Sequence, residues 1–307
     1  MTPPVLDTRA WGLILLLGAI WGVSFLAIKL ALVELPVMTL VAHRVFWAAL
    51  CLWAWVWLRG LARPKGALLW PALLVMGLLN NAVPFTLIAW GQQFIETGLT
   101  SIFNAATAIF GVLVAAAVFR DERLTPRRTI GTAVALAGVI VAIGLSALRG
   151  FDLRNLAQLA TLAGAFSYAC AAVWARAHLS SLSPEIAAAG MLSAASAMLI
   201  PIAIWIDGPP ELPHLPQTYI AVGFVSTLGT AVAYLIYYRI LRMAGSGNAM
   251  LVTLVIPPVS ILAGAVVLGE RLAASAFLGF GLIAAGLLIL DGRVIMKIQD
   301  ARRRIWG

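Results

Sequence analysis

Apolar residues occur along this chain in ten runs, each about as long as a helix that crosses a lipid bilayer. Such a helix needs about 20 residues to cross the roughly 30 Å hydrocarbon core. Only short loops separate the runs, so we expect no attached soluble domain. The pattern predicts an all-α integral membrane protein with ten transmembrane helices, at residues 10–31, 36–58, 68–90, 97–119, 127–146, 156–177, 185–205, 217–240, 246–268 and 272–290.

The second five runs repeat the first five. Glu122-Arg123-Leu124, a charged triplet between two apolar runs, recurs as Glu270-Arg271-Leu272. The two triplets are 148 residues apart, and an ungapped comparison at this offset aligns residues 98–140 with residues 246–288, including Gly131 with Gly279 and Gly138 with Gly286. Pro36 and Pro184 are separated by the same offset. We expect each glutamate to stabilise the positive end of the helix that follows it.

Five spans per repeat is an odd number, so the second half must cross the membrane in the opposite orientation. We expect residues 1–150 to form the first five-helix repeat and residues 151–307 the second, inverted one. Many carriers place their substrate near mid-bilayer, where two such halves meet. The repeat therefore predicts two inverted halves around a central cavity, and it indicates transport.

The composition supports a bilayer as the main solvent, since 62% of the residues are hydrophobic and 11% are charged. A soluble domain is nearer half apolar and a quarter charged. With a cytoplasmic N-terminus, Lys29, Arg149, Arg154 and Arg271 would lie outside and Arg44 within a span, which leaves the other sixteen of the 21 Lys and Arg residues inside. This positive-inside pattern predicts that both termini are cytoplasmic at a bacterial inner membrane. The net charge of the chain is +9, and this distribution favours binding of the basic residues to lipid headgroups over binding to nucleic acid. The same holds for the Arg302–Arg304 tail.

Several short motifs of the first half are typical of one transporter family. They are Trp21-Gly22 with Phe25 and Lys29, Pro36 followed by His43-Arg44 and Ala48, then Ala89, Thr97-Gly98-Leu99, Asn104-Ala105 and Glu122-Arg123-Leu124-Thr125-Pro126 with Gly131 and Gly138. In these motifs the chain resembles the drug/metabolite transporter (DMT) superfamily of the ten-helix EamA type, and within it the YddG-like exporters of amino acids and related metabolites. The resemblance implies that spans one, three, four, six, eight and nine surround the cavity.

One departure from the family pattern concerns the fourth and ninth spans. Span nine contains Pro257-Pro258, whereas span four has Ala108-Ile109 at the matching place, where such carriers often keep a proline. We therefore expect the two halves to bend unequally.

Polar side chains at mid-membrane are costly, so they need partners or a wet cavity. Spans five and ten have no polar residues at their centres apart from glycines, which indicates a scaffold whose neighbours approach closely. The substrate-binding candidates in the other spans are Trp21, Ser24, Asn80, Asn81, Asn104, Thr107, Tyr168, Thr230, Tyr234 and Thr253. Each has a structural alternative: a hydroxyl can bond to its own backbone, an amide can join helices, and an aromatic ring can simply pack.

Four further residues are candidates for an electrostatic or gating role. Arg44 lies about 12 Å along a helix from Pro36, where it either stabilises the structure or offers a cation to a substrate carboxylate. His43 either titrates near neutral pH or makes an orienting hydrogen bond. Pro84 and Pro257 are expected to bend their helices.

The twelve acidic residues all fall in loops or at predicted helix ends. Proton-driven exporters of cationic drugs typically need a buried carboxylate, so the sequence favours a carrier that exports amino acids, aromatic or neutral, or similar small metabolites by alternating access. Efflux of drugs or toxic cations is the alternative, and proton coupling is left open. An enzyme would need a catalytic or metal cluster and a channel a selectivity filter; the sequence suggests neither, so we expect no catalysis, cofactor or metal.

Overall fold

The computed structural model describes residues 7–61, 69–120, 125–144, 153–210, 212–249 and 251–291. The first half contains α1 (Thr8–Ala31), α2 (Val37–Leu58), α3 (Leu69–Gly77), η1 (Leu78–Ala82), α4 (Val83–Gly91), α5 (Thr97–Asn104), α6 (Thr107–Val118) and α7 (Pro126–Ile143). The second contains α8 (Leu153–His178), α9 (Pro184–Asp207), α10 (Pro216–Ser226), η3 (Thr227–Val232), α11 (Ala233–Ala249), α12 (Val252–Leu268) and α13 (Ala274–Asp291). The roles predicted for Glu122, Arg123, Leu124 and the Arg302–Arg304 tail lie outside the described residues.

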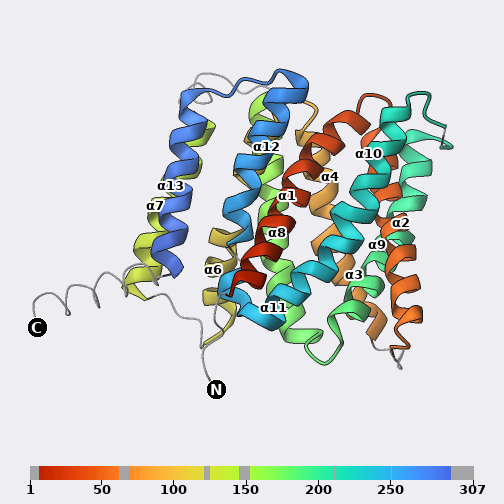
Figure 1. The fold of residues 1–307 in the computed structure, drawn as a ribbon, viewed down its shortest axis with the longest axis horizontal. Helices are drawn as coiled ribbons and strands as arrows, with labels where there is room; N and C mark the ends of the chain where they lie inside the picture. Colours follow the sequence, from red (N-terminus) through yellow and green to blue (C-terminus); the bar gives the residue numbers. More distant parts are fainter. Residues whose placement is uncertain are drawn as a thin grey trace, which may run out of the picture.

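The ten predicted spans are present as apolar helices (Figure 1). In the described part of the chain, eight helices are long and apolar enough to cross a membrane, and α12 and α13 are shorter apolar helices. The third, fourth and eighth spans are each built from consecutive helical segments. The ninth span begins before α12, because α11 includes a kink at Gly245 where the chain turns back. The protein is an all-α multi-pass membrane protein.

Contacts between the halves come in pairs with the roles exchanged. In the first half α4 packs on α8, and in the second half α10 and α11 pack on α1, so each third span contacts the first span of the other half. Likewise α6 packs on α8 as α12 packs on α1, while α2 pairs with α9 and α7 with α13. This exchange of partners is the arrangement of two inverted repeats.

Helices α7 and α13 form a separate pair at one end of the molecule (Figure 1). A Cβ atom on Gly131 would lie 2.8 Å from the Gly286 carbonyl oxygen, and one on Gly138 would lie 2.7 Å from the Gly279 carbonyl oxygen. The prediction that these four glycines allow close packing of spans five and ten is confirmed.

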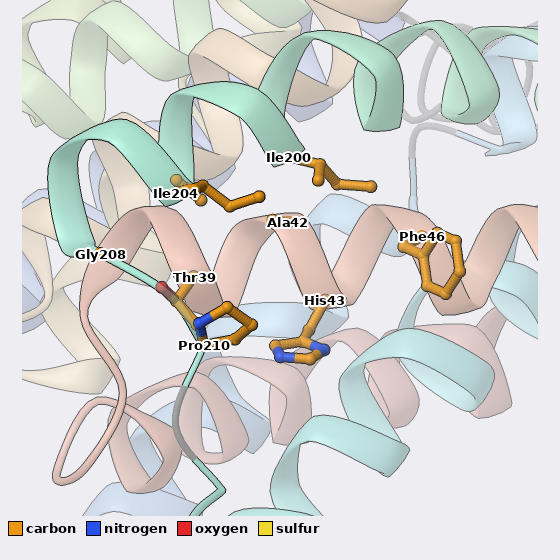
Figure 2. A pocket seen from close by; sticks show the side chains of 9 residues that line it. Thr39, Ala42, His43, Phe46, Ile200, Ile204, Gly208 and Pro210 are labelled. Atoms are coloured by element: carbon orange, nitrogen blue, oxygen red, sulfur yellow. The ribbon is translucent and has the colours of Figure 1, made fainter.

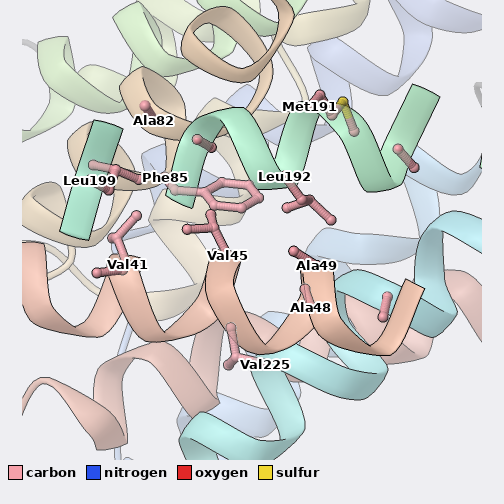
Figure 3. Packing of buried hydrophobic residues seen from close by; sticks show 14 of the residues in the cluster. Val41, Val45, Ala48, Ala49, Ala82, Phe85, Met191, Leu192, Leu199 and Val225 are labelled. Atoms are coloured by element: carbon pink, nitrogen blue, oxygen red, sulfur yellow. The ribbon is translucent and has the colours of Figure 1, made fainter. Parts of the chain in front are cut away.

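At the other end of the bundle, α2 packs against α9. Val45 and Ala49 of α2 belong to a buried cluster with Leu192 and Leu199 of α9, and Phe85 of α4 reaches into the same layer (Figure 3). Apolar and small side chains let these helices approach, and α2 also packs on α4, α10 and η3.

Three carboxylates on the face that carries the α1–α2 loop cap helices of the opposite half. Glu34 accepts from the Leu215 N–H before α10 at 3.1 Å, and Asp207 accepts from the Thr39 N–H of α2 at 2.8 Å. Glu270 accepts from the Thr97 N–H at the start of α5 at 2.9 Å. The first N–H groups of a helix lack intrahelical partners, so each carboxylate stabilises a helix start.

The bonds of Glu270 correct one prediction. Its structural role is right, but the helix that it caps is α5 of the other half and not α13, which follows it. Gly269, with φ 66°, ends α12 in a left-handed turn. The Glu270 carboxylate thereby lies beside Gly264 and Thr97, where it also accepts from the Thr97 hydroxyl at 2.9 Å.

Candidate functional site

Two π-helical turns, η1 and η3, lie at corresponding places in the third and eighth spans. After η1, Pro84 has no N–H to donate to the Asn80 carbonyl, which disfavours a regular α-helical turn there. The second half has no proline at this place; instead Gly229 lies so close to Ser24 that a Cβ atom would be 2.5 Å from the Ser24 hydroxyl oxygen. Because π-turns are frequent at functional sites, these two segments are candidates for part of a functional site.

A side chain from the first span of the opposite half donates to each π-helical turn. The Ser167 hydroxyl of α8 donates to the Leu79 carbonyl of η1 at 2.7 Å. The Trp21 indole of α1 donates to the Gly229 carbonyl of η3 at 3.2 Å. The two halves are thus joined by hydrogen bonds at the π-helical turns η1 and η3 as well as by apolar packing.

Arg44 of α2 lies between the two π-helical spans. Its Nε donates to the Thr230 hydroxyl of η3 at 3.0 Å, and its guanidinium carbon is 3.5 Å from the centre of the Phe85 ring. The Thr230 hydroxyl in turn donates to the Val225 carbonyl at 2.8 Å. Tyr168 of α8 meets Phe85 edge-on, with ring centroids 6.4 Å apart. Elements of both halves therefore surround one cation.

Tyr234 connects this cation to the amides of η1. Its hydroxyl accepts from Nδ2 of Asn80 at 2.8 Å and from Nδ2 of Asn81 at 3.1 Å. The side-chain oxygen Oδ1 of Asn81 is buried and has no hydrogen-bond partner among the described residues. Tyr234 and Tyr168 both interact electrostatically with Arg44. We call Arg44, Asn80, Asn81, Phe85, Tyr168, Thr230 and Tyr234 the central cluster.

The other substrate-binding candidates lie beside this cluster or have local bonds. The Ser24 hydroxyl donates to the Ile20 carbonyl of its own helix at 2.8 Å, which is the structural role considered for it above. The Trp21 ring packs on the Tyr237 ring, with centroids 5.8 Å apart. Thr107 donates to the Asn104 carbonyl at 2.7 Å, at the junction of α5 and α6.

Asn104 and Thr253 are the remaining candidates. In the part of the chain that the structure describes, the Asn104 side-chain oxygen is buried and has no hydrogen-bond partner. Thr253 is in the first turn of α12.

His43 is separated from the cluster although Arg44 is its neighbour in sequence. It borders a cavity of about 170 Å³ between α2 and α9, with Phe46 and Ile204 among its other residues (Figure 2). Its Nδ1 atom accepts from the Trp47 indole at 3.3 Å. A second cavity, of about 140 Å³, lies among Leu99, Ala142, Gln158 and Ala276 and also away from the cluster.

The prolines act differently from the expectation of unequal bending. Pro84 is the second residue after the π-helical turn η1, in the first turn of α4, whereas α12 continues as a helix through Pro257 and Pro258. The ninth span is interrupted just before Val252, and the fourth span is interrupted in a similar way between Asn104 and Thr107. The halves are thus interrupted at similar places, because in the fourth span, which has no proline there, short-range bonds such as that from the Ala108 N–H to the Ala105 carbonyl reshape the backbone.

Sequence reasoning did not identify Phe85 as a site residue, and it did not include span two among the spans that line the site. Phe85 is four residues after Asn81, a spacing that puts two side chains on one face of a regular helix, so this signal was available. The implied set of lining spans omitted span two, which supplies Arg44. Within the described residues, no three His, Cys, Asp or Glu side chains are grouped to hold a metal.

Comparisons with known proteins agree with this architecture. A probable amino-acid metabolite efflux pump of Escherichia coli (strain K12) is 31% identical over an alignment of 290 residues that covers 90% of this chain and 93% of that one. A probable terminal-alkyne amino-acid exporter of Streptantibioticus cattleyicolor is 26% identical over 96% of this chain and 97% of its own. A solved crystal structure with 19% identity shares the fold at a TM-score of 0.67 and covers 98% of this chain and 100% of its own.

The model of the EamA-like transporter family matches residues 9–144 and again residues 155–290, once in each half. The chain therefore belongs to the EamA-like transporter family and is a membrane transporter of the drug/metabolite transporter superfamily.

Proposed function

We propose that this transporter exports amino acids or similar small metabolites across a bacterial inner membrane by alternating access, with the central cluster as its solute site. Two relatives named for amino-acid or amino-acid metabolite export support the solute class. The observation that carries the proposal is the meeting of Arg44, two asparagines and two tyrosines at the paired π-helical turns of opposite halves.

The chemistry of the cluster suits a neutral or zwitterionic solute. It offers amides, hydroxyls and aromatic faces, and its only charge is the cation of Arg44. In the described residues, Asp and Glu lie only at helix ends or in loops, and Glu34, Asp207 and Glu270 already cap helices. A cationic drug would therefore meet a positive charge at mid-membrane and no carboxylate.

Alternating access requires the two halves to separate first on one face and then on the other. We propose that the face with Arg59, Arg120 and Arg239 is cytoplasmic, by the positive-inside rule. The carboxylate caps then lie on the outer face, where they join the halves, and opening to the outside must break them. Residues 1–150 and 151–307 are the two moving repeats in this proposal.

Counterflow in proteoliposomes tests the function. The purified protein is reconstituted and assayed with radiolabelled amino acids and, in parallel, with quaternary ammonium compounds. Saturable amino-acid counterflow supports the proposal. Transport of quaternary ammonium compounds alone establishes the cation-efflux alternative, and no amino-acid transport across a broad panel refutes the proposal.

Two variants test the site. Asn81→Ala is expected to impair transport while the protein still inserts, and Asn104→Ala tests the neighbouring span-four candidate. Ser196→Ala is the control, because this hydroxyl of α9 donates only to the Leu192 carbonyl of its own helix. Unchanged transport in both asparagine variants would show that the solute site lies elsewhere in the protein.

A further inference from the structure

Arg44 has no counter-ion among the described residues. Two other cations differ in this respect: Arg154 pairs with Glu96 at 2.8 Å and Arg242 with Glu185 at 3.0 Å, both near helix ends. The groups that interact electrostatically with Arg44 are Tyr168 and Tyr234. A cation inside a membrane span is costly and usually faces a partner or a cavity, so an isolated one is a functional candidate.

The guanidinium of Arg44 is held in a fixed orientation and keeps free donors. Its face lies on the Phe85 ring, and its Nε bonds to Thr230. A guanidinium has five N–H donors, and within the described part of the chain only the Nε donor of Arg44 has a hydrogen-bond partner. The two terminal nitrogens therefore keep four donors in one plane, a geometry that matches a carboxylate in a bidentate pair.

The neighbours of Arg44 favour an anionic group as the missing partner. Thr230 accepts from the guanidinium but cannot neutralise its charge, since a hydroxyl is uncharged. The amides of Asn80 and Asn81 both donate to the Tyr234 hydroxyl. These groups orient the site but leave its positive charge uncompensated.

We propose that Arg44 binds the carboxylate of the transported solute through its terminal guanidinium nitrogens. This inference rests on the proposed function and narrows the solute class to molecules with a free carboxylate. It predicts that an amino acid is recognised, whereas its amide and the corresponding amine are rejected. Phe85 and Thr230 are positioning residues that hold the guanidinium for this contact.

The experiment compares an amino acid with compounds that keep its side chain and amino group but lack its carboxylate. Counterflow of L-phenylalanine, phenylalaninamide and phenethylamine is measured for the native protein, Arg44→Gln, Arg44→Lys and the control Arg242→Gln, and the transported amino acid replaces phenylalanine if another is preferred. Thermal stabilisation of the same purified proteins by the same compounds gives a readout that does not require transport.

The native protein should prefer the acid over the amide by about tenfold or more, because a charged hydrogen-bonded pair is lost with the amide. Arg44→Gln should reduce this ratio to about one, Arg44→Lys should give an intermediate ratio, and Arg242→Gln should keep it. A purely structural Arg44 would lower the melting temperature of its variants and leave the ratio unchanged.

The outcomes separate this inference from the proposed function. Equal transport of acid and amide by the native protein, or an unchanged ratio in Arg44→Gln, overturns the role of Arg44 and leaves amino-acid export intact. Stabilisation by the carboxylate compounds that Arg44→Gln abolishes supports the role of Arg44 even without transport. Absence of both transport and stabilisation for every carboxylate overturns both proposals.

Discussion

Gly138 of α7 and Gly279 of α13 face each other so closely that a Cβ atom on either would lie 2.6 to 2.7 Å from the carbonyl oxygen of the other. This contact joins the fifth and tenth spans without a polar side chain. Because the obstructing atoms belong to the backbone, a methyl group can be accommodated only if the helices move apart.

Gly279→Ala should therefore destabilise the protein by about 1–3 kcal/mol, the usual range for overpacking. Gly281→Ala is the matched control on the same helix, since a Cβ atom there meets nothing within 4 Å. Thermal unfolding in detergent compares the two. Equal melting temperatures for both variants would contradict the close approach of α7 and α13.

Tyr234→Phe should destabilise the protein and impair transport, because it removes the shared acceptor of Asn80 and Asn81. Loss of the partner of buried amide donors costs about 1–3 kcal/mol. Tyr219→Phe is the control, since it removes a tyrosine hydroxyl that donates to the Pro213 carbonyl at 2.8 Å on the exposed surface. Thermal unfolding and counterflow measure both effects, and similar behaviour of the two variants would argue against the bonds to η1.

The hydrogen bonds of Glu34 lead us to expect that the stability of the protein decreases at acidic pH. The Thr218 hydroxyl, followed by the N–H groups of His214 and Leu215, holds the pKa of Glu34 below its ordinary value of 4.5. The contribution of Glu34 to stability is therefore fully present above about pH 4.5 and is lost as the pH falls through its lower folded-state pKa.

Thermal unfolding of the native protein and of Glu34→Gln between pH 7 and pH 3 checks this dependence. The native protein should be the more stable above pH 4.5, and the difference should shrink at lower pH. A difference that stays constant over the whole range would show that the charge of Glu34 does not contribute.

Glu270→Gln should lower stability by about 1 kcal/mol, the typical loss of a helix cap, because the charged carboxylate holds the first N–H and the hydroxyl of Thr97. Glu185→Gln makes the same chemical change where the partner is the exposed Arg242 and should cost less. Chemical or thermal unfolding ranks the two variants. The opposite ranking would mean that Glu270 does not hold α5 in solution.

Glu270 and Arg44 illustrate where sequence reasoning reached its limit. The repeat identified Glu270 as a structural carboxylate, but not that it caps a helix of the other half, because the turn at Gly269 sets its direction. The composition identified Arg44 as an unusual cation, but its ring contact with Phe85 and its bond to Thr230 join three spans that are distant in the chain. Such contacts depend on how helices pack, which local pattern does not encode.

The sequence by itself determined the ten spans, the duplication and the scaffold role of Gly131, Gly138, Gly279 and Gly286, because apolar length and small residues act locally on each helix. Only the tertiary structure decided which polar residues meet. His43 and Arg44 are adjacent in sequence, yet the rotation of about 100° per residue along α2 directs one toward the cavity beside α9 and the other toward the π-helical turns. The surroundings of each side chain thus followed from the packing of α2 against α9 and against η3 and α4.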